Sequence, residues 1–74
     1  MSKLPETTYK ELIKKIRKAG FEFDRQAKGS HEIWYHPEKR LRTTIPNHSK
    51  PLSKGVLRAI INQIGMTGEE YLML

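Results

Sequence analysis

Cysteine is absent from the sequence, which excludes a disulfide framework and any metal site built from thiolates. Long apolar runs are absent as well. Residues 59–61 form one of the longest, far short of the roughly 20 apolar residues that a membrane-spanning helix needs. Residues 1–5 contain no hydrophobic stretch that could act as a secretion signal. We therefore expect a cytoplasmic protein that has no membrane partner.

Motifs for nucleotide cofactors and metal ions are also missing. The sequence has neither a GxGxxG pattern nor a Walker loop, and Gly29 is the only glycine between residues 21 and 54. His31 and His36 lie five positions apart, which places their side chains on opposite faces of a strand. We expect neither a cofactor nor a metal site.

The length and charge of the chain limit its class. A chain of 74 residues forms one small domain, here residues 1–74, because it buries only about 60% of the surface that it exposes when unfolded. It carries 14 Lys and Arg against 8 Asp and Glu, a net charge of +6, with a pI near 9.8. Such an excess favours polyanionic partners, nucleic acid before an anionic membrane surface.

The segment at residues 8–19 has the periodicity of an amphipathic helix. Thr8 and Glu11 form a capping box at its start, and Gly20 suits the left-handed position after its last turn. The apolar stripe consists of Tyr9, Leu12, Ile13 and Ile16.

A second helix is predicted near the end of the chain, with Ser53 as its N-cap and Gly65 after its last turn. Its apolar stripe consists of Leu57, Ile60, Ile61 and Ile64. Thr67 and Glu70 repeat the capping-box pattern, which predicts a short final helix that carries Tyr71 and Leu72.

Between the helices the apolar period changes to two residues, which is typical of strands. Phe21 and Phe23 alternate with acidic residues, Pro37 suits a tight turn, and Pro46 ends the last apolar run. The expected elements are a half-buried strand at 21–24, a loop at 26–30, a strand at 31–36, a turn at 37–40 and a strand at 41–45.

This order of elements predicts an α+β fold, α-β-β-β-α, with a short C-terminal helix. Short loops favour a three-stranded antiparallel meander, and both helices should cover one face because each has a single apolar stripe. The alternation leaves open whether Ile33 or Trp34 points inward. If Ile33 does, His31 begins on the helix side, at the very end of its strand.

The segment Lys28-Gly29-Ser30-His31 is the best candidate for chemistry. An imidazole titrates near neutral pH, so His31 can take a proton from one oxygen and return it to another. RNA carries its own nucleophile in the 2′-hydroxyl group, so its cleavage needs a proton shuttle and a cation more than a metal ion. An isolated G-S-H tripeptide, however, more often merely connects two strands.

Short motifs occur in a characteristic order from about Tyr9 to Leu72. They are KELIK at 10–14, GF at 20–21, GSH at 29–31, HP at 36–37, IPNH at 45–48, KGVLRAI at 54–60 and GMT at 65–67. This ordered set resembles the HicA family of toxins from bacterial type II toxin–antitoxin pairs. Val56 departs from the threonine that the family commonly has there, and residues 38–39 lack the glycine that it often has in the second hairpin.

The resemblance implies a fold like that of double-stranded-RNA-binding domains, in agreement with the α-β-β-β-α order. It also implies a metal-independent endoribonuclease, an mRNA interferase, whose catalytic residue in the G-S-H motif is His31. The implied partners are mRNA and a HicB-type antitoxin that covers the active face. The rival interpretation is a non-catalytic RNA-binding module, which explains the charge and the topology but not the G-S-H motif.

Phosphate binding is expected from residues around His31 and at the start of the second helix. Lys28, Gly29 and Ser30 precede the histidine directly. Lys54 and Arg58 lie in the first turns of the helix, where the dipole favours an anion and does not itself call for cations.

The other two histidines have weaker signals. His36 precedes a proline at a hairpin, so we expect it to be structural or merely exposed. His48 either binds phosphate or caps the chain locally, and the sequence slightly favours the structural role.

Overall fold

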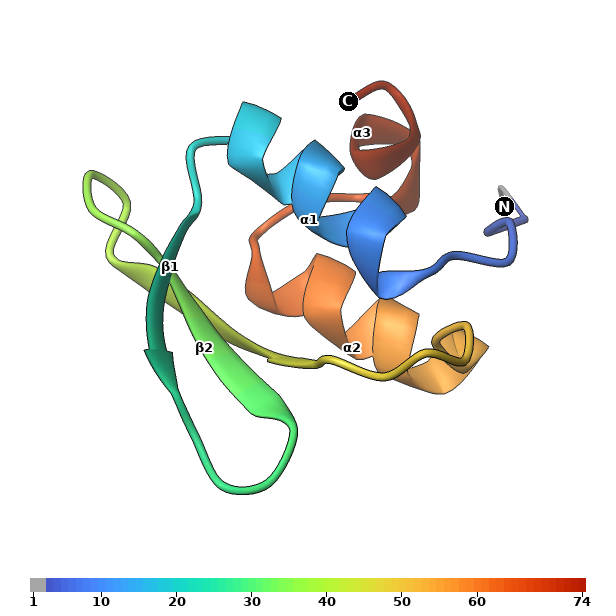
Figure 1. Ribbon diagram of the computed structural model, residues 1–74. Coiled ribbons are helices and arrows are strands. Elements are labelled where there is room, and N and C mark those ends of the chain that lie inside the picture. Colours follow the sequence, from blue (N-terminus) through green and yellow to red (C-terminus); the bar gives the residue numbers. More distant parts are fainter. Residues whose placement is uncertain (1–2) are drawn as a thin grey trace.

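The helices lie together on one side of a small antiparallel sheet (Figure 1). The computed structural model describes residues 3–74. Its elements are α1 (Tyr9–Lys18), β1 (Glu22–Gln26), β2 (His31–His36), β3 (Leu41–Pro46), α2 (Lys54–Gln63) and α3 (Gly68–Leu72). The predicted α+β fold with the order α-β-β-β-α and a short final helix is confirmed.

Helix α1 begins and ends where its local signals predict. The Thr8 side chain accepts a hydrogen bond from the Glu11 backbone N–H, and the Glu11 carboxylate accepts one from the Thr8 N–H at 2.9 Å. Leu12 and Ile16 are completely buried. Gly20 follows the helix with a φ of +100°, a left-handed conformation that glycine adopts without strain.

The second helical region also follows its predicted signals. Ser53 caps α2, and Thr67 forms a reciprocal capping box with Glu70 at the start of α3. The four predicted apolar positions are all buried: Leu57, Ile60 and Ile61 in α2, and Ile64 at its C-cap. Tyr71 of α3 is also completely buried and joins them in one core.

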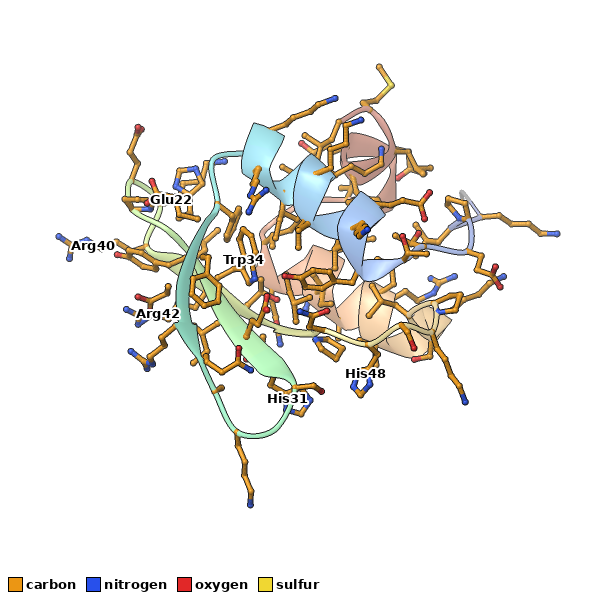
Figure 2. All side chains as sticks on the ribbon, in the orientation of Figure 1. Glu22, His31, Trp34, Arg40, Arg42 and His48 are labelled. Carbon is orange, nitrogen blue, oxygen red and sulfur yellow. The ribbon has the colours of Figure 1, made fainter. Side chains whose placement is uncertain are left out.

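Strand β2 is central in the sheet, between β1 and β3, and its two faces differ sharply. Glu32, Trp34 and His36 are buried, and Trp34 lies between the sheet and the helices (Figure 2). His31 is exposed, and it shares the opposite, outer face with Ile33 and Tyr35, which are only partly buried. Trp34, not Ile33, is therefore the inward residue, and His31 lies on the outer face.

The prediction of a half-buried first strand is wrong. Every residue of β1 is exposed, and Phe21, which is buried, precedes the strand. Phe23 is 49% exposed and only leans edge-to-face on Trp34, with 5.9 Å between ring centroids. The reason is that β1 is an edge strand, whereas α2 packs on β3 at the other edge.

No helix within residues 3–74 has both the length and the apolar character needed to cross a bilayer.

Candidate functional site

The loop before β2 places His31 at the surface. Gly29 has a φ of +63°, and the His31 N–H donates to the Lys28 carbonyl oxygen at 3.2 Å, which closes a tight turn. The Gln26 side-chain amide braces this turn by donating to the carbonyl oxygens of Gly29 at 3.0 Å and His31 at 2.9 Å. The G-S-H motif is therefore held in a defined conformation while the His31 side chain stays exposed.

The connector after β3 runs beside this loop. The Asn47 N–H donates to the Ser30 carbonyl oxygen at 2.9 Å, and Ser30 Oγ lies 2.9 Å from His48 Nε2. Two hydrogen bonds thus join segments that are about 17 residues apart in sequence, as an antiparallel meander permits. Figure 2 shows His31 and His48 at the same edge of the molecule.

The two histidines line one hollow of about 360 Å³. Its other lining residues come from the end of β3, the connector and the start of α2: Pro46, Lys50, Pro51, Leu52, Ser53 and Val56. This volume is at the lower end of the range of small-molecule pockets, roughly 300–1,000 Å³. This hollow, which we call the histidine hollow, is therefore lined by two histidines and a lysine from segments that are far apart in sequence.

Residues predicted to bind phosphate lie at different distances from this hollow. Ser30 contacts His48, which lines the hollow, and Lys28 and Gly29 belong to the turn before His31. Lys54 is exposed and directly follows the lining residue Ser53.

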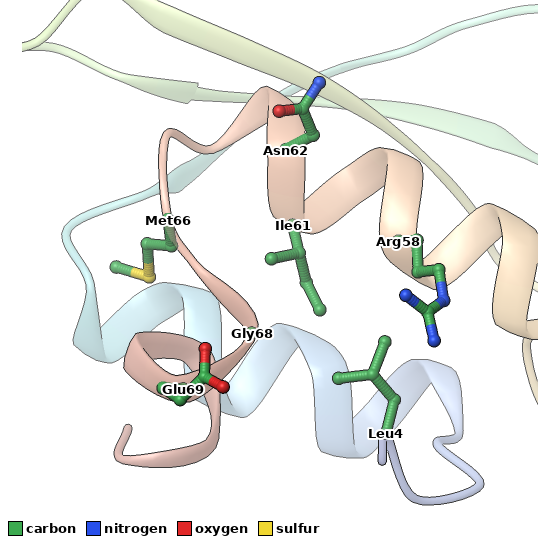
Figure 3. A pocket seen from close by; sticks show the side chains of 7 residues that line it. All are labelled: Leu4, Arg58, Ile61, Asn62, Met66, Gly68 and Glu69. Atoms are coloured by element: carbon green, nitrogen blue, oxygen red, sulfur yellow. The ribbon is translucent and has the colours of Figure 1, made fainter. Parts of the chain in front are cut away.

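Arg58 lies elsewhere. It lines a second hollow, of about 200 Å³, together with Leu4, Ile61, Asn62, Met66, Gly68 and Glu69 (Figure 3). Val56, which lines the histidine hollow, is two residues before Arg58, and two residues turn an α-helix by about 200°. The two side chains therefore point to opposite sides of α2, and the structure does not bring Arg58 to His31.

Lys50 is a lining residue that the sequence interpretation did not single out. It lies in a connector that has no periodic pattern, so no local signal marks it. The predicted meander was the available clue, because it returns the end of β3 to the start of β2.

Glu32 is a second residue that sequence reasoning missed. Its carboxylate is buried, with 7% of the residue exposed, and accepts hydrogen bonds from three neutral donors. They are the Tyr9 hydroxyl group at 2.6 Å, Trp34 Nε1 at 3.1 Å and Asn47 Nδ2 at 3.1 Å. The last of these bonds ties the connector to β2 at the residue that precedes His48.

The hydrogen bond between Tyr9 and Glu32 changes how the tyrosine titrates. Burial, and then the hydrogen bond to the Glu32 carboxylate and its charge, raise the pKa of Tyr9 to about 12. Tyr9 therefore stays protonated, and a hydrogen-bond donor to the carboxylate, at more alkaline pH than an ordinary tyrosine whose pKa is 10.0.

His36 has the structural role that its position suggests. Only 8% of it is exposed, and its Nδ1 accepts a hydrogen bond from the Lys39 N–H at 3.1 Å. Its ring packs edge-to-face on Phe21, with 5.2 Å between centroids. The ring also lies over Gly20, where an added Cβ would be 2.6 Å from His36 Nε2.

The outer face of the sheet carries positive charge towards the end of β2 that lies opposite His31, where Arg42 pairs with Tyr35. The Arg42 guanidinium group lies 4.6 Å from the centroid of the Tyr35 ring, a cation–π contact. Figure 2 shows Arg40 and Arg42 projecting away from the helices. Among residues 3–74, no helix covers this face (Figure 1).

Within residues 3–74, no group of three or more His, Cys, Asp or Glu side chains is arranged to hold a metal ion.

The fold and the hollow define a class: small, basic α+β proteins in which the histidine of a G-S-H motif lines a hollow together with a second histidine and a lysine. A comparison with protein families identifies the member of this class. The family described as HicA toxin of bacterial toxin-antitoxin matches residues 9–66, from the start of α1 to just beyond α2. The chain belongs to the HicA toxin family. No curated protein matches the sequence.

Proposed function

We propose that this HicA-family toxin is a metal-independent endoribonuclease that cleaves mRNA in the cytoplasm, with His31 as its catalytic residue. The observation that supports this best is the position of His31. It is exposed at the start of β2 and lines a hollow that Lys50 also lines. Its expected partner is a HicB-type antitoxin that covers this hollow.

The chemistry needs few groups because the substrate supplies the nucleophile. His31 acts as a general base towards the 2′-hydroxyl group or as a general acid towards the 5′-oxygen. One imidazole cannot do both in the same step, so a second group must complete the reaction. A nearby ammonium group stabilises the charge that develops on the phosphoryl oxygens.

We assign the phosphate contacts to residues that border the histidine hollow. Lys28 and Lys54 are exposed and lie within three residues of the lining residues His31 and Ser53, Gly29 allows a close approach of the RNA backbone, and Ser30 positions the loop. Arg58 lines the other hollow, so we assign it only to long-range attraction of RNA, together with Arg42 on the outer face of the sheet.

The test is cleavage of a long single-stranded RNA in EDTA by wild type and His31→Ala, with RNA binding measured in parallel. We expect fragments from the wild type alone and binding by both proteins. Lys10→Ala serves as the control for lost charge, because Lys10 is an exposed residue of α1 outside the histidine hollow. If neither protein cleaves and both bind with a steep salt dependence, the protein is a non-catalytic RNA-binding module instead.

A further inference from the structure

We propose that His48 is the second catalytic residue of this site and performs the proton transfer that His31 does not. The inference rests on the proposed nuclease function and deepens it. Metal-free cleavage at a 2′-hydroxyl group needs a base and an acid on opposite sides of the phosphorus atom. The histidine hollow holds two imidazoles from different segments, and both are exposed to an incoming substrate.

The Ser30 hydroxyl group fixes the His48 ring. Ser30 Oγ lies 2.9 Å from His48 Nε2, and the Ser30 carbonyl oxygen accepts from the Asn47 N–H at 2.9 Å. The middle residue of the G-S-H motif therefore contacts both His48 and the residue before it. This gives Ser30 a specific task, which is to hold the second histidine beside the first.

The buried Glu32 side chain also holds the segment that contains His48. Glu32 directly follows His31 in β2, and its carboxylate accepts a hydrogen bond from Asn47 Nδ2 at 3.1 Å. Because Glu32 is only 7% exposed and also binds Tyr9 and Trp34, it cannot turn to solvent without breaking several hydrogen bonds. The segments that carry the two histidines are thus joined both at the surface and beneath it.

The reaction balances with these two side chains. One neutral imidazole takes the proton of the 2′-hydroxyl group while O2′ forms a bond to phosphorus. The bond from phosphorus to O5′ breaks, and the other imidazole, protonated, gives its proton to O5′. The products are a 2′,3′-cyclic phosphate and a 5′-hydroxyl end, and no oxidant, reductant or co-reactant is consumed.

The test compares two forms of one short RNA that spans a bond cleaved by the wild type. One form has the ordinary bridging 5′-oxygen at that bond, and the other has sulfur there. A thiolate leaves without being protonated, so the sulfur compensates for loss of the general acid but not of the base. The proteins are wild type, His31→Ala, His48→Ala and His48→Gln, measured in EDTA under single-turnover conditions.

We expect His31→Ala and both His48 variants to cleave the ordinary RNA roughly 10²- to 10⁴-fold more slowly than the wild type, the usual contribution of general acid–base catalysis. Sulfur should restore most of the rate either to His31→Ala or to the His48 variants, but not to both. The general acid is the histidine whose variant regains its cleavage rate with the sulfur substrate. Glutamine can keep the hydrogen bond to Ser30 but cannot transfer a proton, so His48→Gln should behave like His48→Ala.

Three results would overturn the proposal: a His48 variant that cleaves ordinary RNA as fast as the wild type, sulfur rescue of both histidine variants, or rescue of neither. Thermal unfolding of the His48 variants is the control for folding, and their unfolding midpoints should match the wild type because His48 is exposed. If the wild type itself cleaves neither RNA, the proposed nuclease function fails, and this inference fails with it.

Discussion

The two histidines at the ends of β2 have opposite environments. His31 begins the strand on the outer face, exposed and lining a hollow. His36 ends it on the inner face, hydrogen-bonded through Nδ1 and packed between Phe21 and Gly20. Five residues is an odd number of steps along a strand, so the alternation alone separates them. One residue type is thus exposed or packed in the core according to its position in a single strand.

The largest expected effect comes from replacing the two histidines separately. His31→Ala should lower the rate of RNA cleavage by roughly 10²- to 10⁴-fold and leave the free energy of unfolding unchanged, because the ring is exposed. His36→Ala should instead lower the free energy of unfolding by about 1–3 kcal/mol, since it removes a buried ring and a hydrogen bond. Cleavage rates and urea denaturation of both variants check this. Two variants that lose activity and stability alike would contradict the distinction.

The next effect is at Gly20, which the buried histidine covers. Gly20→Ala should lower the free energy of unfolding by about 2–4 kcal/mol, because a Cβ would lie 2.6 Å from His36 Nε2 at a φ of +100°. The matched control is Gly29→Ala, since Gly29 has a φ of +63° but open space around its Cα, and it should lose only about 1 kcal/mol. Urea denaturation measures both, and equal losses would show that His36 is not the cause.

The raised pKa of Tyr9 predicts that the stability of the protein depends on pH in the alkaline range. The pKa of Tyr9 is raised from 10.0 to about 12, so the native state keeps this proton where the unfolded chain loses it. Its contribution to stability is therefore complete below pH 10 and is lost as the pH rises towards 12. Tyr9→Phe should show a shallower loss of stability across this range in urea titrations. The comparison with wild type cancels the effect of Tyr71, whose pKa is also raised by burial. Identical slopes would contradict the raised pKa that burial and the hydrogen bond to Glu32 give Tyr9.

The smallest expected effect is a gain of stability in the hairpin after His36. Arg40 has a φ of +55°, a left-handed conformation that costs non-glycine residues about 1–2 kcal/mol. Arg40→Gly should raise the free energy of unfolding by up to about 1 kcal/mol, because part of the relief is offset by the greater entropy of the unfolded chain. Thermal unfolding is the measurement, with Lys39→Gly as the control at a neighbouring position without a positive φ. A loss of stability in Arg40→Gly would contradict this account of the turn.

Local signals predicted the helices well and the sheet less completely. Caps and apolar stripes placed α1 and α2 correctly because both depend on neighbours within four residues. The burial of Phe23 was predicted wrongly, since it depends on which strands the helices cover. The inward residue of β2 stayed open because Ile33 and Trp34 are both apolar, and only packing distinguishes them.

In the candidate site, too, features that depend on neighbours in sequence could be predicted, and features that depend on tertiary contacts could not. His31 could be singled out as a candidate from the sequence because its motif is continuous. The sequence did not predict that Lys50 lines the site or that Asn47 donates a hydrogen bond to Glu32, because both depend on contacts between segments 15 or more residues apart. Arg58 is a predicted phosphate ligand whose separation from His31 could not be foreseen, because the direction of its side chain depends on helix rotation, which the packed stripe sets.

The most direct test of the central claim is the chemistry of the RNA ends that the wild type produces in EDTA. If the histidine hollow activates the 2′-hydroxyl group of the RNA, each cut must leave a 2′,3′-cyclic phosphate on one fragment and a 5′-hydroxyl group on the other. These ends should be absent from the His31→Ala reaction. Fragments with 3′-hydroxyl and 5′-phosphate ends would contradict the account, because water rather than the RNA would then be the nucleophile.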